Sequence, residues 1–260
     1  MHKLETALKI VSLSDIGKLR SHNEDAMASD IAIGLVVVAD GMGGYNAGEV
    51  ASQMAVLGIT SDIKTKFQQA AQAHTTIDIN IAKKLVLNAV NSGNQAIFDT
   101  AKTQAQCEGM GTTLVLGLFV DNQLVIGHAG DSRAYLLRDK KVMQLTIDHS
   151  VVQEHLDNGL LTEEQAKTSP YKNFVTRAMG IEAEVDLDLN VFDVAIGDIY
   201  ILCTDGLTEM VTNEEITSTI IKHQAHLDKA AKTLIQKANE HGGRDNISVM
   251  LIQILKEVSA

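Results

Sequence analysis

The sequence predicts an α+β fold in which two largely antiparallel β-sheets are sandwiched between helical layers. Runs of strand-like segments stand apart from the long helical segments instead of alternating with them one by one. Segregation of this kind is typical of α+β proteins. No low-complexity linker and no internal repeat interrupts the 260 residues, so we expect a single domain over 1–260.

The strands are predicted from apolar runs and from the alternation of apolar and polar residues. Three of them follow one another between 112 and 138 with tight turns at 121–122 and 130–131, which predicts an antiparallel meander. The polar segment 14–30 is expected to be a loop. The predicted strands cover 10–13, 31–39, 112–120, 124–129, 133–138, 142–145, 185–191, 199–203 and 247–254.

Helices are predicted at 48–60, 81–103, 213–222 and 227–240. On the first of them, Val50, Met54, Leu57 and Gly58 recur near one face. Thr212 and Glu215 have the spacing of a capping box and predict a helix start at 213. Segment 150–172 mixes a short helical pattern with turn residues, so we expect a surface excursion there.

The composition excludes several classes of function. The hydrophobic fraction of 45% is that of a globular protein, and no apolar segment approaches the roughly 20 residues of a membrane helix. The charged start of the chain lacks a signal-peptide core. Asp and Glu number 33 against 22 Lys and Arg, which argues against a nucleic-acid partner. The two cysteines are too few for a disulfide framework, so we expect a cytoplasmic protein without membrane or nucleic-acid partners.

The stretch 35–44 (LVVVADGMGG) combines an apolar run, one carboxylate and three glycines. The run is typical of a buried strand, and Asp40 follows it at the end of that strand. The glycines allow the backbone to bring a carbonyl close to a ligand. Asp40 and the Gly41 carbonyl could therefore hold a hard cation, although an Asp-Gly pair by itself is most often a turn.

Other acids repeat this placement. Asp205-Gly206 also follows an apolar strand, and Asp245 precedes the last strand of the chain. Carboxylates that converge on one edge of a sheet repel one another unless cations neutralise them. Three further acids lie in the predicted loops near these strands: Glu24, Asp25 and Asp131.

Carboxylates with a backbone carbonyl, and without a His-Cys cluster, favour magnesium or manganese over zinc. Two such ions that share a water molecule lower its pKa and make it a nucleophile, which predicts a hydrolase. Arg20 could bind two oxygens of a phosphate in a fork, or it could be a surface arginine paired with Glu24. His128 and His149 lie near these acids and are interpreted as structural residues.

Eight short motifs, in this order, resemble the metal-dependent PPM family of serine/threonine protein phosphatases, the type 2C class, in its bacterial form. They span nearly the whole chain, and their order along it is more specific than any one of them. The motifs are 17–25 (GKLRSHNED), 38–44 (VADGMGG), 111–113 (GTT), 130–135 (GDSRAY), 145–150 (LTIDHS), 176–180 (TRAMG), 204–207 (TDGL) and 244–248 (RDNIS).

The resemblance implies a β-sandwich flanked by helices, with two Mn²⁺ or Mg²⁺ ions at one end. It implies that Asp40 bridges both ions, that Gly41 gives one its carbonyl, and that Asp205 and Asp245 complete the other. Segment 150–172 then corresponds to the flap of the family. The remaining implied roles are metal-bound waters for Glu24 and Asp25, a third, weaker ion for Asp131, and the substrate phosphate for Arg20.

Two positions depart from the family pattern. Met42 follows the Asp-Gly pair where many animal members have a histidine that is proposed as the general acid, and methionine cannot donate a proton. Tyr45 follows the next glycines where many bacterial relatives have a histidine, and the tyrosine pKa near 10 makes it a poor donor at pH 7. The general acid therefore stays unassigned, with a metal-bound water as one alternative.

We expect an enzyme that hydrolyses phosphoserine and phosphothreonine in proteins by direct attack of a water or hydroxide that bridges the two ions. Its partners would be phosphorylated proteins and a cognate serine/threonine kinase, and we expect a monomer. Two alternatives stay open: a small-molecule phosphoester hydrolase on the same centre, and a catalytically silent phosphoprotein-binding module. The complete set of acids favours an enzyme over the silent module.

Overall fold

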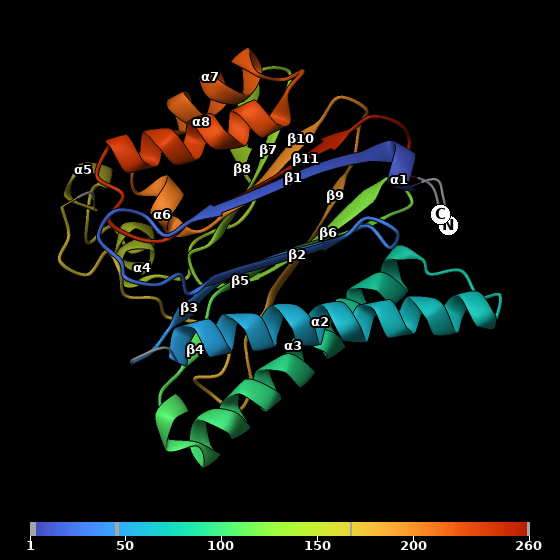
Figure 1. The fold of residues 1–260 in the computed structure, drawn as a ribbon, viewed down its shortest axis with the longest axis horizontal. Coiled ribbons are helices and arrows are strands. Elements are labelled where there is room, and N and C mark those ends of the chain that lie inside the picture. The colour runs from blue at the N-terminus through green and yellow to red at the C-terminus, as the bar shows by residue number, and fades with distance from the viewer. Residues whose placement is uncertain (1–3, 45–46, 167, 259–260) are drawn as a thin grey trace.

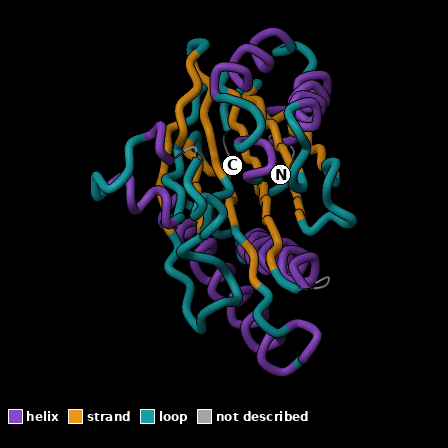
Figure 2. The backbone as a smooth tube through the Cα atoms, turned by 90° about the vertical axis from the view of Figure 1, so that its left-hand side faces the viewer, coloured by secondary structure: helices purple, strands orange, loops and turns teal. Residues whose placement is uncertain are grey.

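The computed structural model describes residues 4–44, 47–166 and 168–258. Two antiparallel sheets lie face to face, and helices cover the outer face of each (Figure 1). The predicted α+β sandwich is therefore confirmed. Seen along another axis, the strands form the middle of the molecule and the long helices its two outer sides (Figure 2).

Each sheet combines strands that are distant in the sequence. In the first, the order is β1 (Leu8–Asp15), β11 (Ile247–Ile254), β10 (Ile199–Cys203), β7 (Arg133–Arg138) and β8 (Lys141–Gln144). In the second, it is β2 (Asp25–Asp30), β3 (Leu35–Met42), β5 (Leu114–Val120), β6 (Gln123–Ala129) and β9 (Asp188–Asp193), with β4 (Gly111–Thr112) paired to the end of β3.

Two of the predictions for strands are wrong. β6 pairs with β5 and β9, while β7 pairs with β10 and β8, so the expected meander is split between the two sheets. The turn that contains Asp131 thus crosses from one sheet to the other. β2 lies within the segment expected to be a loop, because its residues pair with β3 although their side chains are mostly polar or small.

The long helices α2 (Ala47–Gln72) and α3 (Ile79–Thr103) cover the second sheet, and α7 (Asn213–Lys222) and α8 (Leu227–Glu240) cover the first (Figure 1). The capping box of Thr212 and Glu215 is present at the start of α7, as predicted. The short elements are α1 (Leu4–Ala7), a 3₁₀ turn (Ala105–Cys107), α4 (Val151–Asp157), α5 (Glu163–Ala166) and α6 (Asp205–Thr208).

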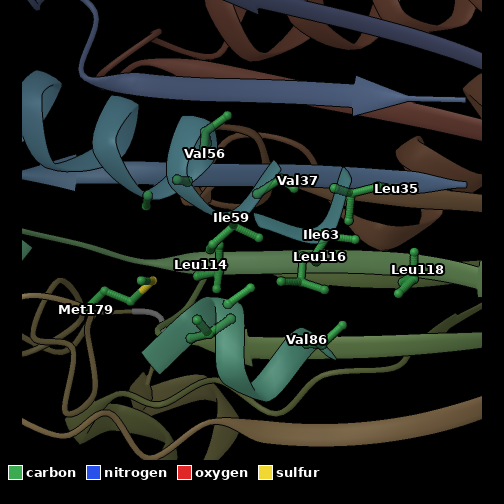
Figure 3. Packing of buried hydrophobic residues seen from close by; sticks show 14 of the residues in the cluster. Leu35, Val37, Val56, Ile59, Ile63, Val86, Leu114, Leu116, Leu118 and Met179 are labelled. Atoms are coloured by element: carbon green, nitrogen blue, oxygen red, sulfur yellow. The ribbon is translucent and has the colours of Figure 1, made fainter. Parts of the chain in front are cut away.

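Three apolar layers hold this arrangement together. Leu35 and Val37 of β3 pack toward α2 and α3 (Figure 3), whereas Val36 and Val38 pack between the two sheets. Because both faces of β3 are buried, its sequence is a continuous apolar run and does not alternate. The third layer lies between the first sheet and helices α7 and α8.

The buried face of α2 carries mostly small residues. Ala51, Ala55 and Ile59 are fully buried, while Leu57 is 67% exposed. Small side chains allow the helix to lie close to the sheet, so the largest apolar residues did not mark the contact face. Within the described residues, no helix combines the length and apolarity that crossing a bilayer requires.

Candidate metal centre

The end of β3 carries Asp40 into a pocket at one end of the sandwich. Asp40 is held on its strand by Thr113, whose Oγ1 accepts from the Asp40 N–H at 3.1 Å and whose N–H donates to the Asp40 carbonyl at 2.9 Å. Gly41 lies against the first turn of α2, where a Cβ would overlap the Gly48 carbonyl. Glycine is therefore required at this position.

Asp205 and Asp245 meet because β10 and β11 are antiparallel neighbours, so the end of one strand lies beside the start of the other. Asp205 is the first residue of α6. A Cβ on Gly206 would overlap the Asn246 carbonyl oxygen, which shows how tightly α6 packs on the turn that precedes β11. The pairing of these two strands thus brings together carboxylates that are 40 positions apart.

The loop that contains Arg20 and Glu24 is fastened to the same turn by Asn246. The Asn246 side-chain Oδ1 accepts from the Glu24 N–H at 2.8 Å, and its Nδ2 donates to the carbonyls of Ile16 and His22, each at 3.0 Å. The sequence assigned no role to Asn246 or to Thr113. The available signal for Asn246 was its place directly after Asp245 in a turn.

Arg20 donates from Nη2 to Asp245 Oδ2 at 2.6 Å. The alternative pairing of Arg20 with Glu24 is not the ion pair that forms. The hydrogen bond to Asp245 is the main cause that raises the pKa of the guanidinium. Arg20 is therefore positively charged at any physiological pH, with half of its side chain exposed at the mouth of the pocket.

The pocket between these elements has a volume of about 210 Å³. It brings together most of the residues predicted for the site, and Asn173 and Val175, which directly follow the flap, contribute to its wall. Asp25 does not line it. The predicted site residues in its wall are Arg20, Glu24, Asp40, Gly41, Asp131, Asp205 and Asp245.

Burial and mutual repulsion raise the pKa values of several of these acids. Burial, together with the charges of Asp25 and Asp205, raises the pKa of Asp40 well above its usual range. Burial, together with the charges of Asp131 and Asp245, raises the pKa of Asp205 as well. Burial raises the pKa of Asp25 to about 7 and that of Asp131 to about 6. The chain has thus assembled carboxylates that cannot all be ionised without counter-charges.

The donor set fits divalent metal ions. Asp205 Oδ1 and Asp25 Oδ1 are buried and have no hydrogen-bond partner. Buried carboxylate oxygens without partners are costly unless a cation binds them. The pocket offers oxygen ligands and, among its described lining residues, no histidine or cysteine, which favours Mg²⁺ or Mn²⁺.

Met42 also lines the pocket, beside Gly41 and Gly43. Its side chain is a thioether, which has no proton to donate. The pocket therefore contains methionine at the position where many animal members of the family have a histidine. Tyr45, the second position considered for a proton donor, lies outside the described residues.

A second, open groove of about 460 Å³ lies beside the pocket and shares Asp131 and Asp205 with it. One of its walls is the flap, with Val152, Gln153 and Leu156 of α4, and the other includes Thr208 and Glu209 at α6. Lys172 at the end of the flap forms an ion pair with Glu209 at 2.7 Å. A polypeptide in this groove would therefore pass directly beside the acids.

Comparison with known proteins agrees with this geometry. The family description "Protein phosphatase 2C" matches residues 19–250. A serine/threonine phosphatase (stp) of Listeria monocytogenes is 39% identical over 243 residues, which are 92% of this chain and 93% of that protein. Protein phosphatase PhpP of Streptococcus pneumoniae is 36% identical over 256 residues, 96% and 99% of the two chains.

Solved structures give the same result. The serine/threonine phosphatase PstP/Ppp of Mycobacterium tuberculosis superposes with a TM-score of 0.84 at 34% identity, over 96% of this chain and 100% of that one. A structure of the PstP catalytic domain in complex with two manganese ions has a TM-score of 0.83, also at 34% identity, over 96% and 99%. The chain therefore belongs to the metal-dependent protein phosphatase 2C (PPM) family of serine/threonine phosphatases, in its bacterial form.

Proposed function

We propose that this phosphatase removes phosphate from phosphoserine and phosphothreonine in proteins with two Mn²⁺ or Mg²⁺ ions held by the acid cluster. The observation that carries the proposal is the convergence of five carboxylates and one arginine on a pocket of about 210 Å³. A phosphate group needs positive charge around it, and an unneutralised acid cluster would repel it.

The proposed ligands are supported by the geometry of the pocket and by the family. Asp40, the Gly41 carbonyl, Asp205 and Asp245 would hold the two ions. Their placement at the ends of strands supports these roles, because rigid elements hold them. Glu24 and Asp25 would take part through water molecules, and Asp131 would hold a third ion. For Asp25, this indirect role fits its position outside the pocket wall.

When bound, the ions would lower the pKa of a water molecule and offset the negative charge of the phosphate. Arg20, at the mouth of the pocket, orients two phosphate oxygens with its planar guanidinium. Met42 cannot protonate the leaving serine or threonine oxygen, and no histidine is among the described lining residues. The donor that we propose for the leaving group is a water molecule.

A protein substrate is favoured over a small phosphoester by the groove beside the pocket, which would accommodate polypeptide next to the phosphorylated residue. We further propose that the enzyme is a cytoplasmic monomer that opposes a serine/threonine kinase. A small-molecule phosphoester hydrolase and a silent binding module remain the alternatives that experiment must separate.

The test is hydrolysis of a phosphothreonine peptide and of p-nitrophenyl phosphate with Mn²⁺ or Mg²⁺, with EDTA, and with Asp205→Asn. Asp62→Asn, on the exposed face of α2, is the matched control. We expect peptide hydrolysis that EDTA and Asp205→Asn abolish and Asp62→Asn leaves intact. Activity that survives EDTA and Asp205→Asn would overturn the metal mechanism. A folded protein that binds Mn²⁺ and turns over no phosphoester would favour the binding module.

A further inference from the structure

A buried pair of histidines lies behind the Asp131 turn, outside the catalytic pocket. His128 of β6 and His149, which precedes the flap, are 1% and 7% exposed. Their rings stack, with centroids 4.5 Å apart and planes within 13° of parallel. With the carboxylate of Asp188 on β9, they form a group whose potential ligand atoms lie within 4.8 Å of one another.

The hydrogen bonds assign this group to a different role from metal binding. The Gly130 N–H donates to His149 Nδ1 at 3.2 Å, so Nδ1 carries the lone pair and Nε2 carries the proton of the neutral ring. Nε2 lies 3.4 Å from Asp188 Oδ2. Arg177 Nη1 lies 3.0 Å from Asp188 Oδ1 and 3.3 Å from His149 Nε2. This guanidinium occupies the place where a cation would bind and would repel it.

We infer that His149 is a positioning residue that aims the Asp131 carboxylate into the catalytic pocket by holding both polar backbone groups of Gly130. Besides the bond to Nδ1, the His149 N–H donates to the Gly130 carbonyl at 3.0 Å. The part of the inference that concerns metal binding by Asp131 rests on the proposed function.

Gly130 has little freedom to find other partners. Its φ of +109° is a conformation that favours glycine. A Cβ there would come within 2.7 Å of the Thr113 side chain, so the turn is packed tightly against the residue that also holds Asp40. If Nδ1 were removed, a buried N–H would be left without an acceptor, and the turn would rotate to satisfy it. Asp131 is the next residue along the chain and would rotate with it.

The other edge of the His149 ring faces Asp188 and Arg177. Asp188 Oδ2 lies 3.4 Å from Nε2 and favours a proton on that nitrogen, and Arg177 Nη1 lies 3.0 Å from Asp188 Oδ1. The His149 carbonyl accepts from the Thr176 N–H at 2.8 Å, which fastens the segment that contains Arg177 to the same residue. Burial is the main cause that lowers the pKa of His149, with His128 and Arg177 contributing, so the neutral ring with its single lone pair is the form present at pH 7.

Two isosteric substitutions separate the two ends of the ring. In His149→Asn the amide oxygen takes the place of Nδ1, and in His149→Gln the amide nitrogen takes the place of Nε2. His128→Gln is the matched control, since His128 Nε2 contacts the Ile147 carbonyl and His128 has no bond to Gly130. The first readout is the exchange rate of the Gly130 amide proton in the metal-free protein, measured by NMR. The second is the Mn²⁺ concentration that gives half-maximal hydrolysis of p-nitrophenyl phosphate.

We expect His149→Gln to speed Gly130 exchange and to raise the half-saturating Mn²⁺ concentration, each by about tenfold, the loss expected for one hydrogen bond. His149→Asn and His128→Gln should stay near wild type in both. Equal impairment of the Asn and Gln variants, or an effect of His128→Gln as large as that of His149→Gln, would overturn the inference. Because exchange is read without turnover, the result stands apart from any failure of the proposed function.

A measurement on the unmodified protein keeps the inference testable if a variant does not fold. The ¹⁵N chemical shifts of the His149 ring report its tautomer directly. We expect the shift of an unprotonated Nδ1 and a protonated Nε2 at pH 7. A protonated Nδ1 cannot accept a hydrogen bond from the Gly130 N–H. Finding one would refute the proposed role of His149 in positioning Asp131.

Discussion

Asp25 and Asp40 are direct cross-strand partners in the β2–β3 ladder. Side chains at such positions project from the same face of a sheet, and like charges directly opposite each other destabilise the pair. The repulsion is therefore part of the fold itself, and the strands that build the core also build a site that requires cations.

The first prediction concerns the stability of the metal-free protein. The pKa of Asp25 is about 7 in the folded protein against an ordinary value of 3.8, so the folded state binds more protons than the unfolded state between these values. The free energy of unfolding should fall as the pH rises from about 4 to about 7, by up to about 1.4 kcal/mol per pKa unit. Asp25→Asn should flatten this dependence. Urea unfolding in EDTA across this range measures it, with Asp62→Asn as the control. A variant whose stability falls as steeply as that of the wild type would contradict it.

A second prediction concerns Arg20. If its guanidinium mainly positions phosphate, Arg20→Ala should raise KM for a phosphothreonine peptide by about tenfold or more, as for a lost charge-assisted hydrogen bond, and lower kcat less. The KM of Arg20→Lys should lie between those of the wild type and Arg20→Ala, because an ammonium cannot form the planar fork. Steady-state kinetics at saturating Mn²⁺ give both constants. An unchanged KM would show that Arg20 serves only as the partner of Asp245.

The glycine that follows Asp205 gives a third prediction. Gly206→Ala should destabilise the protein by about 1–3 kcal/mol through overpacking against Asn246 and weaken Mn²⁺ binding. Gly58→Ala is the matched control, since a Cβ at this exposed position of α2 meets nothing within 4 Å and should stabilise the helix by about 0.5–1 kcal/mol. Denaturant unfolding and calorimetric Mn²⁺ titration report the two effects. Wild-type Mn²⁺ affinity in Gly206→Ala would show that α6 can shift without disturbing Asp205.

The ion pair between Lys172 and Glu209 gives a fourth prediction. As a partly exposed pair, it should contribute less than about 1 kcal/mol to stability. Because both residues line the groove and not the pocket, Lys172→Met should change kcat/KM for a phosphoprotein several-fold and leave that for p-nitrophenyl phosphate unchanged. The reversed pair, Lys172→Glu with Glu209→Lys, restores the contact and should recover most of the activity. An equal change in kcat/KM for both substrates would contradict this prediction, because it would show that the substitution acts on the pocket and not on the groove.

The sequence alone predicted which acids the pocket brings together. Asp40, Asp205 and Asp245 were found because an apolar strand that ends or begins at a carboxylate is a local pattern. The helix start at Thr212 was also correct, since a capping box involves only four neighbouring residues. These features depend on positions close together in the chain, which is where periodicity and turn chemistry act.

Only the tertiary structure decided how these pieces meet. β6 and β7 are consecutive strands in different sheets, and strand periodicity specifies which side chains share a face but not which strand lies alongside. β2 is a strand because β3 pairs with it, and α2 buries alanines because the sheet comes close to it. The contacts of Asn246 with the Arg20 loop and of His149 with Gly130 join distant segments. The acids were visible in the sequence, whereas the residues that hold them in place became visible only when the chain was folded.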